Sequence, residues 1–146
     1  MKLNNKITTV ILMSVISAHA SAFIVPEFEF YEGSQGQQDT VCNLSVLPGN
    51  KEDFYFKKND CTNDEARSLI IRDAPAGTII KIYDDPKMSS NDDYLTINVI
   101  QDIIEDKVIG TFEESFSDES VEVIYHEDNG LNGKVSAVRI TVPNID

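Results

Sequence analysis

Two polar turns lie 69 residues apart in this sequence, and they are the positions where a ligand could be shared. Residues 63–71 (NDEARSLII) open with Asn63 and Asp64, and residues 132–140 (NGKVSAVRI) open with Asn132 and Gly133. Each turn runs into small and aliphatic residues that suit a β-strand. We therefore interpret the two segments as copies of one supersecondary unit, whose polar turns are the best candidates for a common ligand site.

Other residue combinations do not favour catalysis. His126 is the only histidine after residue 22, which excludes a zinc site built from several histidines, and we interpret it as a solvated turn residue. No serine stands in a G-x-S-x-G pattern, and the acids of residues 84–93 miss the EF-hand spacing. Paired acids can hydrolyse glycosides, but adjacent acids in loops are usually solvated; the pairs here are Asp84/Asp85, Asp92/Asp93 and Glu113/Glu114. The sequence predicts a protein that is not an enzyme.

Short strands separated by turn signals must position the two polar turns. Residues 27–30 alternate polar and apolar side chains, as a half-buried strand does, and several other segments repeat this pattern. Residues 100–108 are ambiguous, and we expect strand or irregular structure there with room for a single helical turn. The pattern predicts an all-β sandwich or barrel. The predicted strands are 27–30, 40–46, 53–57, 68–72, 78–83, 95–99, 121–125 and 134–142.

The N-terminus has the pattern of a secretory signal. Two lysines precede an apolar stretch that is short for a membrane span, and small residues follow at cleavage-type spacing. We favour cleavage before Phe23; cleavage before Ser21 and retention of the segment as an anchor are the alternatives. The prediction is an exported protein, periplasmic or extracellular, with a signal peptide at 1–22 and a single domain at 23–146.

The acidic composition limits the kinds of partner. The formal charge of the whole chain is −13, and loss of Lys2 and Lys6 with the signal would make it −15. Such a charge repels nucleic acid and anionic lipid, so we expect neither nucleic acid nor a membrane as a partner of the mature form. It suits cations or basic protein patches, and solubility alone is an equally simple reason for it. The sequence identifies no protein partner.

The two cysteines predict one disulfide. Cys42 and Cys61 are the only cysteines, and exported chains with an even cysteine count usually pair them. Closing a loop of this length stabilises a protein by roughly 3 kcal/mol. A metal or catalytic use of the pair is the alternative, but no CxxC spacing occurs and no histidine stands nearby.

The two repeated segments resemble the βγ-crystallin-like Greek-key domains of secreted microbial proteins. That family closes each Greek key with N/D-N/D-x-x-S/T-S followed by an aliphatic strand. Residues 63–71 are similar to it with Arg67 in the S/T place, and residues 132–140 are similar with Gly133 and Ala137 as departures. Residues 30–36 and 82–86 look like the aromatic hairpins that open the family's motifs. The resemblance covers residues 28–142 and implies a two-Greek-key β-sandwich of the βγ-crystallin type, with motif 1 at about 27–73 and motif 2 at about 78–142.

The resemblance also implies a calcium ligand. Family members bind calcium at sites shared between motifs, through oxygen donors that suit a hard cation. Carried over, one site would use the Asn63 carbonyl, the Asp64 carboxylate, the Ser136 hydroxyl and a carbonyl near Asp84. The second site would need a carboxylate at Gly133 and a hydroxyl at Arg67, and both are missing. The simpler alternative is that these polar side chains only cap turns.

We therefore expect a small exported, non-enzymatic domain with a structural or binding role and calcium at one site. The alternative is a secreted protease inhibitor or toxin-like effector, which the resemblance also allows. An inhibitor would present a rigid exposed loop, and residues 84–93 and 112–120 are the candidates.

Overall fold

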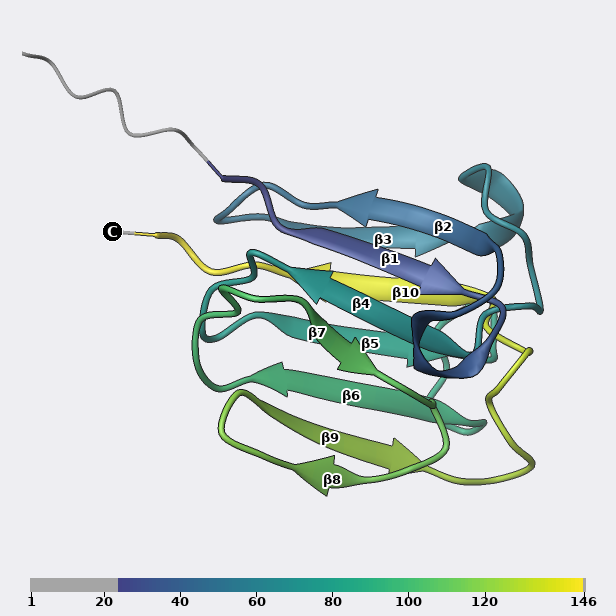
Figure 1. Ribbon diagram of the computed structural model, residues 1–146. Helices are drawn as coiled ribbons and strands as arrows, with labels where there is room; N and C mark the ends of the chain where they lie inside the picture. Colours follow the sequence, from purple (N-terminus) through teal and green to yellow (C-terminus); the bar gives the residue numbers. More distant parts are fainter. Residues whose placement is uncertain (1–23, 146) are drawn as a thin grey trace, which may run out of the picture.

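Two antiparallel β-sheets form the protein, and the computed structural model describes residues 24–145. One sheet has four strands in the order β2-β1-β4-β7, and the other has six in the order β3-β10-β5-β6-β9-β8 (Figure 1). The predicted signal peptide, 1–22, lies outside the described residues. The strands are β1 (Glu27–Tyr31), β2 (Thr40–Ser45), β3 (Lys51–Tyr55), β4 (Ser68–Arg72), β5 (Ile79–Tyr83), β6 (Tyr94–Val99), β7 (Lys107–Ile109), β8 (Phe116–Ser117), β9 (Val121–His126) and β10 (Ala137–Thr141).

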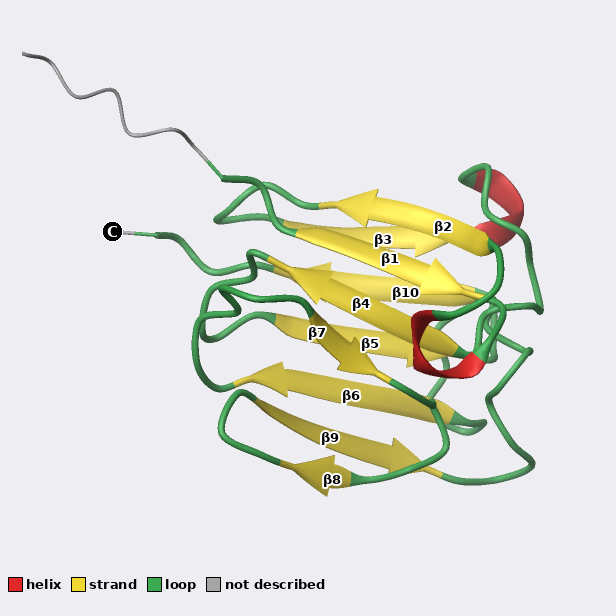
Figure 2. Cartoon of the chain, viewed as in Figure 1, coloured by secondary structure: helices red, strands yellow, loops and turns green. Residues whose placement is uncertain are grey.

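The predicted all-β class is confirmed. The only helices among the described residues are two 3₁₀ turns, η1 (Ser34–Gly36) and η2 (Phe56–Lys58), at the loop end of the molecule (Figure 2). None of the described helices has the length and apolar character needed to cross a bilayer. The described part of the chain is therefore built from strands and the turns that join them.

Each half of the chain gives one strand to the sheet of the other half. β3 comes from the first half but pairs with β10 in the six-stranded sheet, along Ala137↔Tyr55 to Thr141↔Lys51. β7 comes from the second half but pairs with β4 in the four-stranded sheet. This reciprocal exchange ties the two halves into one two-sheet sandwich.

The core fills the space between the sheets. Alternate residues of each strand point inward, so β1 buries Phe28 and Phe30 while the glutamates between and beside them stay partly exposed. Loop residues close the ends of the core. The largest fully buried side chains are Phe28, Phe30, Phe56, Phe112, Leu69, Ile71, Ile80, Ile82, Leu95, Ile97, Ile109 and Leu131.

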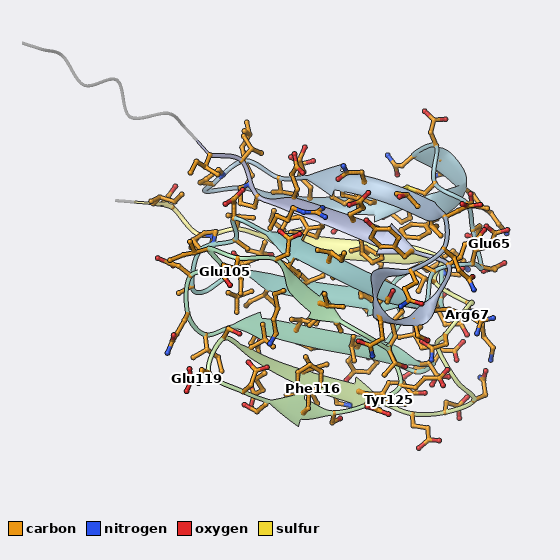
Figure 3. All side chains as sticks on the ribbon, viewed as in Figure 1. Glu65, Arg67, Glu105, Phe116, Glu119 and Tyr125 are labelled. Carbon is orange, nitrogen blue, oxygen red and sulfur yellow. A yellow bond between two sulfur atoms is a disulfide. The ribbon has the colours of Figure 1, made fainter. Side chains whose placement is uncertain are left out.

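A hairpin makes the second half longer than the first. β8 and β9 extend the six-stranded sheet at the outer edge of β6, and β9 buries Val121 and Val123. Phe116 and Tyr125 lie on this hairpin (Figure 3) and pack against the core. This hairpin lies between β7 and β10 and adds residues to the second half before its polar turn. The two polar turns are therefore separated by more residues than β1 and β5, the first strands of the two halves.

Several predicted element boundaries were wrong. The last strand begins at Ala137 and not at residue 134, because the backbone before it turns to bond the other half of the chain. The strand predicted at 53–57 is β3, which ends at Tyr55, and Phe56 enters a 3₁₀ turn that buries its ring. Over residues 100–108 the expectation of strand or irregular structure is confirmed, because residues 100–106 are irregular and β7 begins at Lys107.

The predicted disulfide is present between Cys42 on β2 and Cys61 in the loop after η2. Their Cα atoms are 4.8 Å apart and 19 residues separate them in sequence. Both cysteines are buried at the edge of the core. The bond therefore fixes the loop that leads to Asn63 and Asp64 against the four-stranded sheet.

Candidate cation site between the two turns

The two polar turns bond each other through equivalent backbone groups. The amide of Asp64 donates to the Val135 carbonyl across 3.2 Å, and the amide of Gly133 donates to the Ala66 carbonyl across 2.9 Å. At an offset of 69 residues, Asp64 corresponds to Gly133 and Ala66 to Val135. The same contact is thus made twice in opposite directions, which supports the interpretation of the segments as two copies of one unit.

A second pair of hydrogen bonds has donors, Arg67 and Ser136, that correspond at the same offset. Arg67 donates its backbone amide to the Tyr31 carbonyl at the end of β1, and Ser136 donates its amide to the Tyr83 carbonyl at the end of β5. The distances are 2.8 Å and 3.0 Å. Each turn is therefore held against the strand that opens its own half while it contacts the turn of the other half.

Asp64 and Ser136 bring one oxygen donor from each half together. The Ser136 hydroxyl donates a hydrogen bond to Asp64 Oδ1 across 3.3 Å. Asp64 has a φ of 62°, a left-handed conformation that aspartate tolerates better than most residues. Ser136 is 8% exposed and its backbone is bonded on both sides, so its main chain is held beside Asp64. The structure thus joins two of the four predicted ligands.

Asp84 adds negative charge to the same region. Burial raises the pKa of its carboxyl group, and Asp92, Asp93 and Asp64 raise it further, while Lys134 opposes them. Carboxylate oxygens of Asp84, Asp92 and Asp93 lie within 4.8 Å of one another. A divalent cation would relieve this repulsion, because an opposite charge favours the ionised form of a carboxyl group.

The side chain of Asn63 has a feature that its predicted role did not include. Both polar atoms of its carboxamide are buried without a hydrogen-bond partner among the described residues. The prediction used only the Asn63 backbone carbonyl. The side chain lines a cavity together with Ser136, so it lies beside the region where Asp64 and Ser136 meet.

The corresponding place in the other half is filled by Arg67. A Cβ atom added to Gly133 would lie 3.1 Å from Arg67 Nη2, so the guanidinium covers Gly133 closely. Arg67 and its neighbour Glu65 lie at one end of the molecule, and Glu105 and Glu119 lie at the other (Figure 3). An arginine stays charged at any physiological pH, so it opposes a cation here.

Asp93 is the residue whose role the sequence analysis missed. It is fully buried, and its carboxylate accepts hydrogen bonds from the Tyr125 hydroxyl and from the amides of Asp128, Asn129 and Gly130. Burial alone would raise the pKa of Asp93, but these hydrogen bonds lower it to about 2. The interpretation of Asp92/Asp93 as a solvated pair was therefore wrong for Asp93. Its oxygens are already occupied, so Asp84 and Asp64 are better placed to bind a cation.

Other polar side chains cap turns through hydrogen bonds to backbone amides, which is the alternative to ligand binding that the sequence analysis left open. Glu113 accepts the amides of Leu131 and Asn132 at 2.9 and 2.7 Å, so the pair Glu113/Glu114 is not simply solvated either. The Asn132 carboxamide accepts the Phe112 amide across 3.0 Å and donates to Thr111. In the sequence these acids look like ordinary loop acids, because the amides they accept lie far along the chain.

His126 is exposed, as predicted, although it ends β9 and does not lie in a turn. Its ring stacks on Tyr94 with centroids 4.0 Å apart, and Tyr94 in turn stacks on Tyr83. Among the described residues, His126 is not a member of the cluster of possible metal ligands, which consists of Asp84, Asp92 and Asp93. The arrangement is that of a cross-strand aromatic row on the outer face of the six-stranded sheet.

The loops proposed for an inhibitor are held by their own hydrogen bonds. Asp85 accepts the amides of Lys87 and Ser89 within residues 84–93. In residues 112–120, Phe112 is fully buried and Asp118 accepts the amides of Ser120 and Val121. Neither loop exposes a large apolar side chain, and inhibition of a protease stays a prediction.

Searches of known protein families, curated proteins and solved structures found no match to this chain.

Proposed function

We propose that this chain is a small exported, non-enzymatic domain of the βγ-crystallin-like Greek-key type that binds calcium at one site and has a structural or binding role. The ligands are the Asp64 carboxylate and the Ser136 hydroxyl, completed by the Asn63 carbonyl and by oxygen atoms at Asp84. Calcium suits this set because all the donors are oxygen atoms, the ligands that a hard cation requires.

The contact between Asp64 and Ser136 carries the proposal. These residues are 72 positions apart in sequence, yet their side-chain oxygens approach to 3.3 Å. The acidic group at Asp84 lies close enough for Asp64 to raise its pKa. The Asp64 carboxylate and the Ser136 hydroxyl thus meet where the two halves of the chain pack together, and the acidic group at Asp84 lies in the same region.

The strand arrangement supports the Greek-key part of the proposal. β3 and β7 are exchanged between the sheets of the two halves, so the two related units form one two-sheet sandwich. Ser68 also fits the last serine of the family pattern. It is buried, it donates to the Gly33 carbonyl and it accepts the Gly36 amide across 2.9 Å, so it fixes the fold-over that follows β1.

Calcium titration of the purified protein by calorimetry, together with thermal melts, tests the proposal. We expect one ion per chain with a dissociation constant of roughly 10⁻⁴–10⁻³ M, as in extracellular modules. Saturation at 100 times the dissociation constant should stabilise the protein by about 2.7 kcal/mol. Asp64→Ala should abolish both the heat and the stabilisation.

Glu119→Ala is the matched control. Glu119 is exposed and lies at the opposite end of the molecule from Arg67 (Figure 3), and its removal changes the net charge by the same amount. Wild-type calcium affinity in Asp64→Ala, or an equal loss in Glu119→Ala, would contradict the proposed site.

A further inference from the structure

A basic cavity lies beside the proposed cation site. Its volume is about 530 Å³, within the roughly 300–1,000 Å³ typical of pockets for small molecules. η2 and the loop of residues 84–93 form its walls. The lining residues besides Asn63 and Ser136 are Tyr55, Lys57, Lys58, Pro86 and Lys87.

The charge of this cavity is opposite to that of the protein. Lys57, Lys58 and Lys87 are three of the seven lysines among residues 24–145, in a chain whose formal charge is −13. The salt bridges between described residues use Arg72, Lys107 and Arg139 and none of these three lysines. Lys58 Nζ instead lies 5.2 Å from the centroid of the Tyr55 ring. Three ammonium groups without a carboxylate partner favour an anion.

The carboxamide of Asn63 supplies an independent indication of a ligand. Its nitrogen and oxygen are buried and lack any hydrogen-bond partner within the described part of the chain, although Asn63 lines the cavity. Buried polar groups are nearly always satisfied in folded proteins. A carboxamide offers two donors and one acceptor atom, which matches a group that both accepts and donates, such as a sugar hydroxyl.

We propose that this cavity binds an anionic sugar, with its carboxylate or sulfate group against Lys57 and Lys87 and a hydroxyl against Asn63. The Tyr55 ring and Pro86 provide apolar surface for the sugar ring. A small-molecule site combines largely apolar walls with a few placed polar groups, and this cavity has that composition. The inference goes beyond calcium binding and does not require it, since the lysines supply the charge that holds the anion.

Titration with glucuronate, followed by NMR amide shifts or calorimetry in the absence of calcium, tests the inference. We expect saturable binding of glucuronate and at least tenfold weaker binding of glucose, which lacks the charge. Lys57→Gln with Lys87→Gln should weaken glucuronate binding at least tenfold. Lys51→Gln with Lys81→Gln is the control, because it removes the same charge from β3 and β5 outside the basic cavity, and it should change the affinity less than twofold.

Two single variants separate this site from the cation site. Asn63→Ala removes the carboxamide but keeps the backbone carbonyl, so it should weaken glucuronate binding about fivefold or more and leave the calcium response intact. Asp64→Ala should do the reverse. Failure of the calcium proposal alone would leave the glucuronate result unchanged.

Three results would overturn the inference. If glucuronate shows no saturable binding at millimolar concentration, the cavity is not a sugar-binding site. Inorganic sulfate that binds as tightly as glucuronate shows that charge alone is recognised and that there is no sugar site. An equal loss of affinity in the Lys51/Lys81 control shows that the effect comes from net charge and not from the basic cavity.

Discussion

The Ser136 hydroxyl and the Asp64 carboxylate lie 3.3 Å apart, although 72 residues separate them in the chain. The backbone amide of Asp64 is bonded to Val135, next to Ser136, so the same stretch that supplies the hydroxyl also fixes the acid. Any ion bound by one of these side chains must therefore lie close to the other.

Ser136→Ala should weaken calcium binding about tenfold while Asp64→Ala removes it. A single oxygen ligand is lost in the first case, and the ionised group is lost in the second. Calorimetric titration of both variants measures the difference. Ser117→Ala, which removes an exposed hydroxyl from β8, is the control. An unchanged calcium affinity in Ser136→Ala would mean that the serine only bonds Asp64 and does not reach the ion.

Gly133→Asp combined with Arg67→Ser should create a second calcium site. Gly133 has a φ of 75° and Asp64 already adopts 62° at the equivalent position, so aspartate can be accommodated at a cost of about 1 kcal/mol. The guanidinium that covers Gly133 is removed by the second change. Titration should then give two ions per chain where the wild type gives one.

Each single change provides the control for this pair. Gly133→Asp alone should bind one ion, because Arg67 would pair with the new carboxylate. Arg67→Ser alone lacks the carboxylate and should also bind one. A double variant that is folded and still binds one ion would show that the two turns are not equivalent as ligand sites.

Asp93 should make the stability of the protein depend on pH at the acid end. Its pKa is about 2 in the folded protein and 3.8 as an ordinary value, so the folded form favours the ionised group. The stabilisation is then fully present above about pH 4 and is lost as the pH falls towards 2. A shift of this size corresponds to about 2 kcal/mol.

Urea denaturation of Asp93→Asn between pH 6 and pH 2 measures this contribution. The variant should lose about 2 kcal/mol at pH 6 and show a weaker fall of stability below pH 4 than the wild type. Asp39→Asn, an exposed acid before β2, should lose little. An Asp93→Asn protein with the acid sensitivity of the wild type would mean that the Tyr125 and 128–130 hydrogen bonds do not depend on the charge.

Cys42→Ala with Cys61→Ala should destabilise the protein by roughly 3 kcal/mol, because the bond restricts the unfolded chain across a separation of 19 residues. Chemical denaturation of the double variant, and of the wild type with and without reductant, measures the effect. The wild type under reductant should match the double variant. A loss below 1 kcal/mol would indicate that the segment from β2 to Asn63 is held by its other contacts alone.

Local pattern was enough to predict most of the fold. Alternation of polar and apolar side chains located β1, β6 and β9, because the side chains of a strand alternate between a buried and an exposed face, and aliphatic or β-branched runs located β4 and β5. The predicted strand boundaries were wrong where the chain bends to meet distant groups. Phe56 is an example, because its backbone amide donates a hydrogen bond to the Ser136 carbonyl. The sequence around Phe56 carries no signal of that partner.

The candidate site was predicted only in part. Asp64 and Ser136 were paired through the resemblance to the βγ-crystallin-like family, and the structure brings them together. Asp93 was missed because its partners, the Tyr125 hydroxyl and three consecutive amides, lie more than thirty residues further along the chain. The buried, unpartnered carboxamide of Asn63 could not be predicted either, since the burial of a side chain depends on all the residues packed around it.

Features set by composition or by neighbouring residues can be derived from the chain itself: its acidity, its strand pattern, its single possible disulfide and its two related turns. The exchange of β3 and β7, the cover of Gly133 by Arg67 and the grouping of three lysines around Asn63 depend on contacts between distant segments. Packing decides these, because many arrangements of the same strands would satisfy the local pattern, and the contact between Asp64 and Ser136 depends on the arrangement that the whole chain adopts.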